Sequence, residues 1–241
     1  MPRKWYAGRV IRIEDASSTT RRFWIQADEL ERFDFRAGQF VTFDLPISEK
    51  RRERWRSYSI ASAPDGTNVF ELCIVRLEGG KGTTYLFDEV QEGSILSFKG
   101  PDGVFTLPKN LDREIVLICT GTGVAPFRSM LGALKESGGP QQPLHLIFGT
   151  RHEEGILYRE EMETLAKEWP NFRFDVALSR EKDWDGYQGY VHQVYQEHYA
   201  EVDSDRLFLL CGWQNMVDEA VDQLTEKMGY DKQQVVFELY G

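Results

Sequence analysis

Short runs of alternating apolar and polar residues fill the first hundred positions of the chain. Such alternation is typical of β-strands with one buried face, and pairs such as Asp65-Gly66 and Asp102-Gly103 mark the turns between them. One helical stretch, Thr83–Val90, interrupts the runs, and Thr83 is expected to cap its first turn. The pattern predicts a small antiparallel β-barrel with strands at Tyr6–Glu14, Thr20–Gln26, Phe40–Leu45, Ser57–Ala61, Phe70–Leu77 and Ser94–Lys99.

The pattern changes after about residue 110. Continuous apolar runs now alternate with segments of helical periodicity, which predicts βαβ units and a parallel sheet that binds ligands at the carboxyl ends of its strands. We therefore expect two domains, residues 1–109 and 110–241. The predicted strands are Glu114–Cys119, Leu144–Phe148, Phe172–Leu178, Arg206–Cys211 and Val235–Leu239, and the predicted helices are Ala125–Lys135, Arg159–Lys167, Val191–His198 and Gln214–Met228.

Composition narrows the class of partner. The 241 residues are 41% hydrophobic and carry a formal net charge of −10, with a pI near 5.0. This charge repels nucleic acids and anionic membranes, so small molecules or proteins are the expected partners. No apolar run approaches a membrane-spanning length and no signal peptide is evident, so a cytoplasmic location is expected.

Cysteines and histidines predict no metal site. Cys73, Cys119 and Cys211 each lie in an apolar run, without the spacing of a zinc or iron-sulfur site, which is typical of buried thiols in a reducing compartment. The four histidines show no metal-ligand spacing either and are interpreted as structural or surface residues: His145, His152, His192 and His198.

The segment Arg56-Ser57-Tyr58-Ser59 carries the first candidate chemistry. Strand alternation puts Arg56 and Tyr58 on one face, where a ring can stack on a flat cofactor and a guanidinium can pair with its phosphates. The hydroxyl of Ser59 can bond a ring nitrogen. The alternative is a half-buried tyrosine beside an arginine whose charged end extends into solvent, with no cofactor bound.

The segment Gly121-Thr122-Gly123-Val124-Ala125-Pro126 follows the first strand of the predicted parallel sheet. Two glycines permit a tight turn and the close approach of a phosphate to the amides at a helix N-terminus, and Pro126 suits the first turn of that helix. The alternative is a tight connection without a ligand.

Further candidates follow the later strands. Ser179 and Arg180 suit a nucleotide 2′-phosphate, and Tyr190 can stack on adenine, unless Arg180 is a solvated loop residue and Tyr190 packs under its helix. Cys211-Gly212 leaves room for a planar ring, although a buried structural cysteine fits equally well.

Two other segments have alternative interpretations. The final strand ends in aromatic residues that either pack a core or cover a cofactor. The run Lys50-Arg51-Arg52-Glu53-Arg54 is either a solvated loop or a docking surface for an acidic redox partner.

Together these motifs resemble the ferredoxin-NADP reductase family over nearly the whole chain. The flavin signature Arg-x-Tyr-Ser is met at Arg56 to Ser59, and the second signature, Gly-x-x-Ser/Thr-x-x-Leu, at Gly80 to Leu86. The resemblance implies that Arg56 holds the FAD pyrophosphate, Tyr58 stacks on the flavin and Ser59 bonds flavin N5. It also implies cofactor contacts for Ser57, Cys73, Ile74, Val75, Gly80, Lys81, Gly82, Thr83 and Thr84.

The resemblance extends to the nucleotide half. It implies catalytic roles for Ser59, Cys211, Glu238 and Tyr240. The chain departs from the plant-type ending because Gly241 follows Tyr240, so Phe237 is the other candidate to cover the flavin; Trp213 stands where many relatives have proline. The implied nucleotide-binding residues are Thr122, Gly123, Val124, Pro126, Ser179, Arg180, Tyr190, Cys211, Gly212, Met216 and Tyr240.

The implied function is that of an FAD-dependent oxidoreductase that prefers NADPH to NADH and exchanges electrons with a ferredoxin or a flavodoxin. The alternatives are an NADH-dependent reductase component of a multicomponent oxygenase, a free flavin reductase, and a non-catalytic regulatory subunit with a flavin-binding fold. The sequence leaves the oligomeric state open and favours a monomer.

Overall fold

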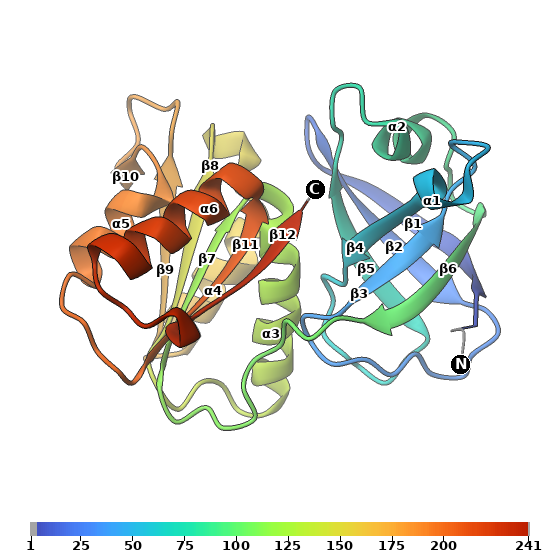
Figure 1. Cartoon of the computed structure of the whole chain (residues 1–241). Coiled ribbons are helices and arrows are strands. Elements are labelled where there is room, and N and C mark those ends of the chain that lie inside the picture. The colour runs from blue at the N-terminus through green and yellow to red at the C-terminus, as the bar shows by residue number, and fades with distance from the viewer. Residues whose placement is uncertain (1–3, 241) are drawn as a thin grey trace. The chain divides into compact units, whose positions relative to one another are not determined.

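The computed structural model describes residues 4–240, with the backbone alone for Tyr240. The described chain forms two compact units, which are treated separately (Figure 1). The first comprises residues up to Thr106 together with Ala125–Ala133, and the second comprises Leu107–Val124 together with residues from Leu134 onward. An antiparallel sheet in the first unit and a parallel sheet in the second confirm the predicted fold class. The division between residues 109 and 110 stays a prediction.

The first unit is built on a six-stranded antiparallel sheet in the order β4-β3-β6-β1-β2-β5. An antiparallel bridge between Ile60 and Leu72 joins the two ends of this order, so the sheet closes into a barrel. Phe23, Phe43, Phe70 and Phe98 fill its interior. The strands are β1 (Tyr6–Ser17), β2 (Thr20–Ala27), β3 (Phe40–Asp44), β4 (Trp55–Ser59), β5 (Val69–Val75) and β6 (Ile95–Asp102).

The helices within the barrel part of this unit, α1 and α2, differ from prediction. Helix α2 (Lys81–Asp88) begins two residues before Thr83, so Thr83 is not its cap. The Thr83 hydroxyl instead accepts a hydrogen bond from the Leu77 amide at 3.1 Å, which fixes the loop before the helix. The basic run, interpreted as either a loop or a docking surface, contains the short helix α1 (Arg51–Arg54).

A buried carboxylate links three parts of the first unit. Glu71 on β5 accepts two hydrogen bonds from Arg22 on β2, at 2.6 and 3.1 Å, and one from Arg128 at 2.8 Å. Arg128 also donates to the Ala61 carbonyl oxygen at 3.0 Å, just beyond the Arg56–Ser59 segment. The segment that follows Ser59 is therefore held by a buried charge cluster of Arg22, Glu71 and Arg128.

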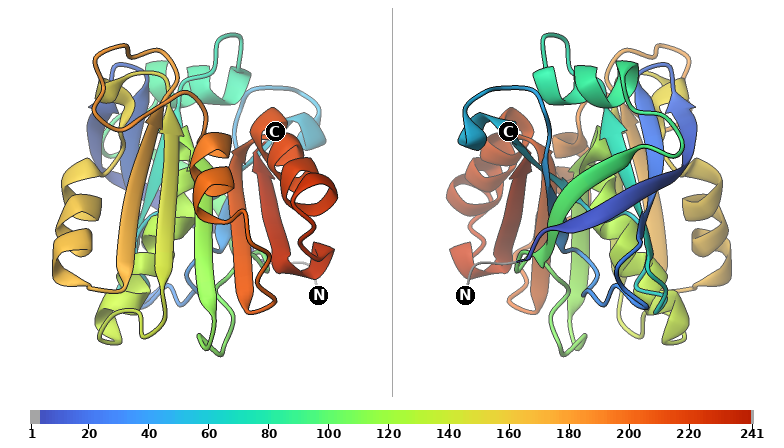
Figure 2. Two further views of the ribbon diagram at one scale, coloured as in Figure 1. Left: turned by 90° about the vertical axis from the view of Figure 1, so that its left-hand side faces the viewer. Right: turned by 90° about the vertical axis from the view of Figure 1, so that its right-hand side faces the viewer.

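The second unit is a parallel sheet in the order β10-β9-β8-β7-β11-β12. Helices α5 and α6 pack on one face of it, over a core that includes Ile118, Ile147 and Phe208 (Figures 1 and 2). Its strands are β7 (Glu114–Thr120), β8 (Leu144–Thr150), β9 (Phe172–Leu178), β10 (Tyr187–Gln188), β11 (Arg206–Trp213) and β12 (Val235–Tyr240). Its helices are α3 (Val124–Glu136, largely grouped with the first unit), α4 (Arg159–Glu168), α5 (Val191–His198) and α6 (Gln214–Asp222).

Two predicted ends in this unit are wrong. Strand β11 continues to Trp213, so Cys211 does not close it. The predicted final helix, Gln214–Met228, is found as α6 up to Asp222 followed by a π-helical turn, Gln223–Lys227, so the helical conformation ends one residue before the predicted end. Among the described residues, no helix has the length and apolar content needed to cross a membrane.

The buried His145 lies between a tyrosine hydroxyl and a carboxylate in the second unit. Its Nδ1 lies 2.7 Å from the Tyr199 hydroxyl and its Nε2 lies 3.0 Å from Asp175 Oδ2. Burial lowers the pKa of His145 despite Asp175. Burial works against the ionised form of Asp175, but His145 and Arg173 outweigh it and hold the pKa of Asp175 below its usual value. The folded state therefore favours a neutral imidazole beside a carboxylate.

This arrangement predicts a loss of stability in mild acid. A histidine whose pKa is lower in the folded state contributes fully above its unfolded pKa of 6.5, and that contribution falls as the pH drops toward the folded value. Urea midpoints measured at about pH 7.5 and pH 5.5 should therefore differ less for His145→Gln than for the parent. His152→Gln, at an exposed histidine, should behave like the parent. Equal pH dependence in His145→Gln and the parent would contradict the assignment.

Candidate functional site

The predicted flavin-binding residues on strand β4 alternate between the two faces of the strand. Arg56 and Tyr58 alternate along the strand with Ser57, whose hydroxyl lies 2.9 Å from that of Thr42. The Tyr58 ring is half-buried, and burial raises the pKa of its phenol, so the ring stays neutral. Ser59, at the end of the strand, is only 4% exposed. Strand β4 thus places Arg56 and Tyr58 on one face by alternation, and their roles toward FAD stay predictions.

The N-terminus of α2 lies directly beside Arg56. No side chain caps this helix, whose N-cap is Gly80. A Cβ on Gly82 would lie 2.9 Å from Arg56 Cγ, so the guanidinium stem packs on the first turn only because residue 82 is glycine. Free amides at a helix start and an adjacent guanidinium form a site for a phosphate group. This donor set fits the pyrophosphate of FAD.

The other predicted residues of this half-site lie on β5 and on the first turn of α2. Cys73 and Ile74 are buried on β5, and Val75 is partly exposed where that strand ends. Lys81 and Thr84 are exposed on the first turn of α2.

The turn after β7 is a single 3-10 turn, Gly121–Gly123, that leads into α3. A Cβ on Gly123 would lie 2.3 Å from the Cys211 carbonyl oxygen, so only glycine allows the turn to pack against β11. Thr122, Val124 and Pro126 are buried, which leaves backbone rather than side chains as the ligand-binding groups of this turn.

Thr120 is a polar residue that the sequence prediction missed. Among the described residues its buried hydroxyl has no hydrogen-bond partner. It faces Gly212, where an added Cβ would lie 2.5 Å from Thr120 Oγ1. A buried hydroxyl without a partner is costly, so Thr120 is a candidate ligand-binding group. The sequence signal that could have found Thr120 is a threonine at the end of a strand, directly before Gly-x-Gly.

The predicted 2′-phosphate residues follow β9. The Ser179 hydroxyl lies 3.4 Å from the Thr150 carbonyl oxygen, and the Arg180 amide donates to the Arg151 carbonyl oxygen at 2.9 Å. This backbone bond brings together two exposed arginines, and neither forms an ion pair within residues 4–240. Arg151 was missed because only the pairing of β8 and β9 makes it a neighbour of Arg180.

Tyr190 stands at the start of α5 and is 68% exposed, so it does not pack under its helix. Its ring centroid lies 6.4 Å from that of His192. An exposed ring close to Ser179 and Arg180 in sequence is consistent with stacking on a nucleotide base.

The predicted catalytic groups of the second unit lie on β11 and β12. Cys211 is completely buried, in register with Cys119 on β7 and with Glu238 on β12. Gly212 and Met216 are also buried. On the same two strands Trp213 and Phe237 are exposed. The side chain of Tyr240 and all of Gly241 lie outside the described residues, so their predicted roles stay predictions.

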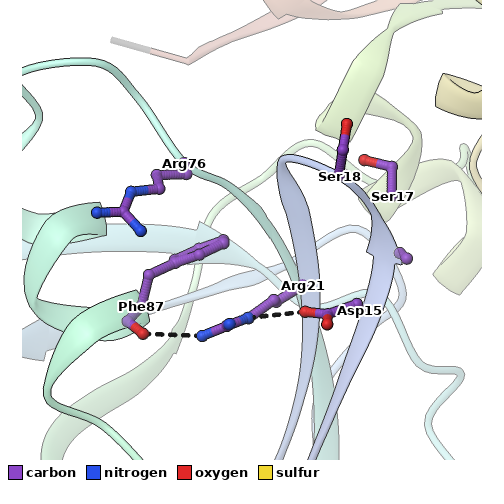
Figure 3. A pocket seen from close by; sticks show the side chains of 7 residues that line it. Asp15, Ser17, Ser18, Arg21, Arg76 and Phe87 are labelled. Carbon is purple, nitrogen blue, oxygen red and sulfur yellow. Dashed lines mark hydrogen bonds and ion pairs between the residues drawn. The ribbon is translucent and has the colours of Figure 1, made fainter.

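A cavity of about 440 Å³ lies elsewhere, between the end of the β1–β2 hairpin and α2 (Figure 3). It contains none of the predicted site residues. Arg21 pairs with Asp15 at 2.8 Å and Arg76 with Asp88 at 2.8 Å, so both cations of its lining are balanced. The residues at β4, α2 and the strand ends of the parallel sheet are therefore better candidates than this cavity.

Comparisons with known proteins assign a domain family to each part of the chain. Residues 7–107 match the oxidoreductase FAD-binding domain family and residues 117–222 match the oxidoreductase NAD-binding domain family. The ferredoxin--NADP reductase B of Sorangium cellulosum is 35% identical over 98% of this chain and 97% of its own length. The chain belongs to the ferredoxin-NADP reductase family. The sequence-based resemblance is thereby confirmed, and the protein is an oxidoreductase.

Other members of the family differ in length and in name. The toluate 1,2-dioxygenase electron transfer component of Pseudomonas putida is 31% identical over 98% of this chain and 68% of its own. The phenol hydroxylase P5 protein of Acinetobacter pittii is 32% identical over 94% of this chain and 63% of its own. A cytochrome P450 reductase from Amycolatopsis superimposes with a TM-score of 0.87 at 29% identity, over 99% of this chain and 70% of its own. These relatives support an FAD-dependent pyridine nucleotide oxidoreductase that delivers electrons.

Proposed function

We propose that this protein oxidises NADPH through FAD and passes the electrons to a small acidic carrier protein such as a ferredoxin or a flavodoxin. When bound, FAD accepts two electrons from the nucleotide and releases them singly or together. The observation that carries the proposal is the pair of half-sites, a phosphate-binding helix N-terminus beside Arg56 in one unit and an unpaired arginine pair at the strand ends of the other.

The chain's own residues have separate tasks in this proposal. Arg56 and the first turn of α2 bind the pyrophosphate, and Tyr58 stacks on the flavin. Ser59 donates or accepts a hydrogen bond at the flavin ring, and its burial excludes water there. Cys211 and Gly212 orient the nicotinamide, and Glu238 holds or relays a proton.

The preference for NADPH rests on Arg151 and Arg180. A guanidinium that is not engaged by a carboxylate is free to pair with the 2′-phosphate, and such charged hydrogen bonds contribute roughly 1.5–3 kcal/mol each. We expect Arg180→Gln to lower kcat/KM for NADPH by about 10- to 100-fold and to change that for NADH by less than about 2-fold. Lys182→Gln, an exposed cation in the same loop, should leave both unchanged. Equal losses for the two nucleotides would contradict the assignment.

The acidic carrier is supported by the charge around α1. Arg51 and Arg52 are exposed in a chain of net charge −10, and Lys99 lies 4.0 Å above the Trp55 ring next to them. Such a local excess of positive charge favours an acidic partner and makes docking depend on ionic strength. Reduction of ferredoxin or flavodoxin by NADPH should therefore saturate with carrier and weaken with added salt. Equally fast reduction of free flavin or quinone without any carrier protein would overturn this part of the proposal.

A second candidate is the reductase component of a multicomponent oxygenase. It is favoured by the relatives named as phenol hydroxylase and toluate dioxygenase components. NADH would be the better electron donor for such a component. The kcat/KM values for NADPH and NADH, measured on the parent and on Arg180→Gln, therefore separate the two proposed functions.

A further inference from the structure

An acidic residue directly follows the arginine that the proposed function assigns to the 2′-phosphate. Glu181 is nevertheless turned toward the segment after β8. Its Oε1 lies 3.0 Å from His152 Nδ1 and accepts a hydrogen bond from the Glu153 amide at 3.4 Å. A carboxylate that neighbours Arg180 in sequence is thus bonded to another loop.

The other acidic residues near this loop are either paired with Arg159 or exposed. Glu153 pairs with Arg159, which pairs with Glu163 as well. Asp183 and Asp185 are exposed farther along the loop. Within the described part of the chain, Arg151 and Arg180 are the adjacent cations that no carboxylate engages. Glu181 is the acid directly beside Arg180 in sequence, and its carboxylate is held by the segment after β8 rather than by this arginine pair.

The loop itself is held in place independently of His152. Its far end forms β10, where Tyr187 and Gln188 pair with Ala177 and Leu178. The indole N–H of Trp184 donates to the Val176 carbonyl oxygen at 3.3 Å. Loss of the His152 side chain would consequently leave the Glu181 carboxylate only its longer contact with the Glu153 amide, at 3.4 Å, without unfolding the loop.

We propose that His152 is a specificity-determining residue of the nucleotide site, which holds the Glu181 carboxylate away from Arg151 and Arg180 so that both guanidiniums stay available to a 2′-phosphate. This inference rests on the proposed function. His152 acts through Glu181 and is a positioning residue, since it is not assigned a contact with the nucleotide. The His152–Glu181 bond is exposed, with side chains 47% and 36% accessible, so it contributes little to folding stability. Its effect is to fix the position of the Glu181 carboxylate.

A released carboxylate weakens 2′-phosphate binding in two ways. It pairs with a guanidinium that the phosphate needs, and it repels the phosphate directly. At a solvated surface each of these charge interactions is modest, so a combined loss of about 3- to 10-fold in affinity is expected.

The test compares two ligands that differ only in the phosphate. Adenosine 2′,5′-bisphosphate and 5′-AMP are titrated calorimetrically into the holoprotein of the parent, His152→Ala, Glu181→Gln and the double variant. We expect His152→Ala to bind the bisphosphate about 3- to 10-fold more weakly and 5′-AMP equally well. The double variant should bind the bisphosphate as tightly as Glu181→Gln does, because the released carboxylate is then absent.

The outcomes separate this inference from the function on which it rests. If the parent does not prefer the bisphosphate over 5′-AMP, the assignment of NADPH fails. If the parent prefers it but His152→Ala keeps that preference, the role of His152 is wrong. If the double variant stays as weak as His152→Ala, the loss does not act through Glu181 and the inference is overturned. Restoration in the double variant supports it.

Discussion

Arg56→Gln is expected to yield a protein that is purified with little or no FAD. The Arg56 stem packs on the uncapped first turn of α2, and its Nη1 donates to the Trp55 carbonyl oxygen at 2.7 Å, so the proposed pyrophosphate site combines a held guanidinium with the amides of that turn. Glutamine keeps most of the side chain but removes the charge and the forked donors. The loss of two charge-assisted hydrogen bonds corresponds to roughly 3–6 kcal/mol, or more than about 100-fold in affinity. Flavin content, and the FAD dissociation constant of the apoprotein, measure this effect.

The basic helix α1 offers a matched control. Arg52→Gln removes an exposed cation four residues away and should leave FAD affinity within about 2-fold of the parent. A second variant, Gly82→Val, keeps Arg56 but places a side chain where its stem packs, and it should also lose FAD. Normal flavin content in both Arg56→Gln and Gly82→Val would show that the pyrophosphate lies elsewhere.

Glu71→Ala is expected to destabilise the first unit strongly. The Glu71 side chain is 3% exposed and bonds Arg22 and Arg128, so its removal leaves two partly buried cations without their common partner. Breaking a buried ion pair in this way costs about 3–5 kcal/mol, which corresponds to a drop of roughly 6–20 °C in melting temperature for a chain of this size. Thermal unfolding followed by circular dichroism measures the effect.

Glu14→Gln is the control for this change, because Glu14 is the other carboxylate near Arg22, at 3.5 Å, and its side chain is 37% exposed against 3% for Glu71. Its melting temperature should stay within about 2 °C of the parent. The melting temperature of Glu71→Gln should lie between those of Glu71→Ala and Glu14→Gln, because the glutamine amide oxygen still accepts hydrogen bonds. A melting temperature unchanged in Glu71→Ala would mean that the buried cluster contributes nothing to the fold.

Periodicity alone was sufficient for most of the architecture. The bounds of β9 and α5 agree with prediction at both ends, and the change from alternating to continuous apolar runs separates the two sheets correctly. These features depend on local sequence, which is why they are predictable. The start of α2 was missed because the Thr83 hydroxyl bonds the preceding loop instead of the helix end.

The candidate site residues also fall into two groups, those that local sequence predicts and those that only the folded structure brings together. Arg56, Tyr58 and the Gly121–Gly123 turn are recognisable because their spacing follows from one strand or one turn. Arg151 and Thr120 become candidates only through strand pairing and burial, which bring Arg151 next to Arg180 and leave the Thr120 hydroxyl without a described partner. The Glu71 cluster joins three distant segments and has no local signature.

The central claim is most directly tested by anaerobic reduction of the protein-bound flavin. The visible spectrum of the purified holoprotein is recorded, and NADPH or NADH is then added in separate cuvettes while flavin absorbance is followed by stopped flow. We expect a flavin spectrum that bleaches much faster with NADPH than with NADH. Faster bleaching by NADH would keep the reductase but remove the role of Ser179, Arg180 and Arg151. A protein that binds no flavin, or whose flavin neither nucleotide reduces, would contradict the account.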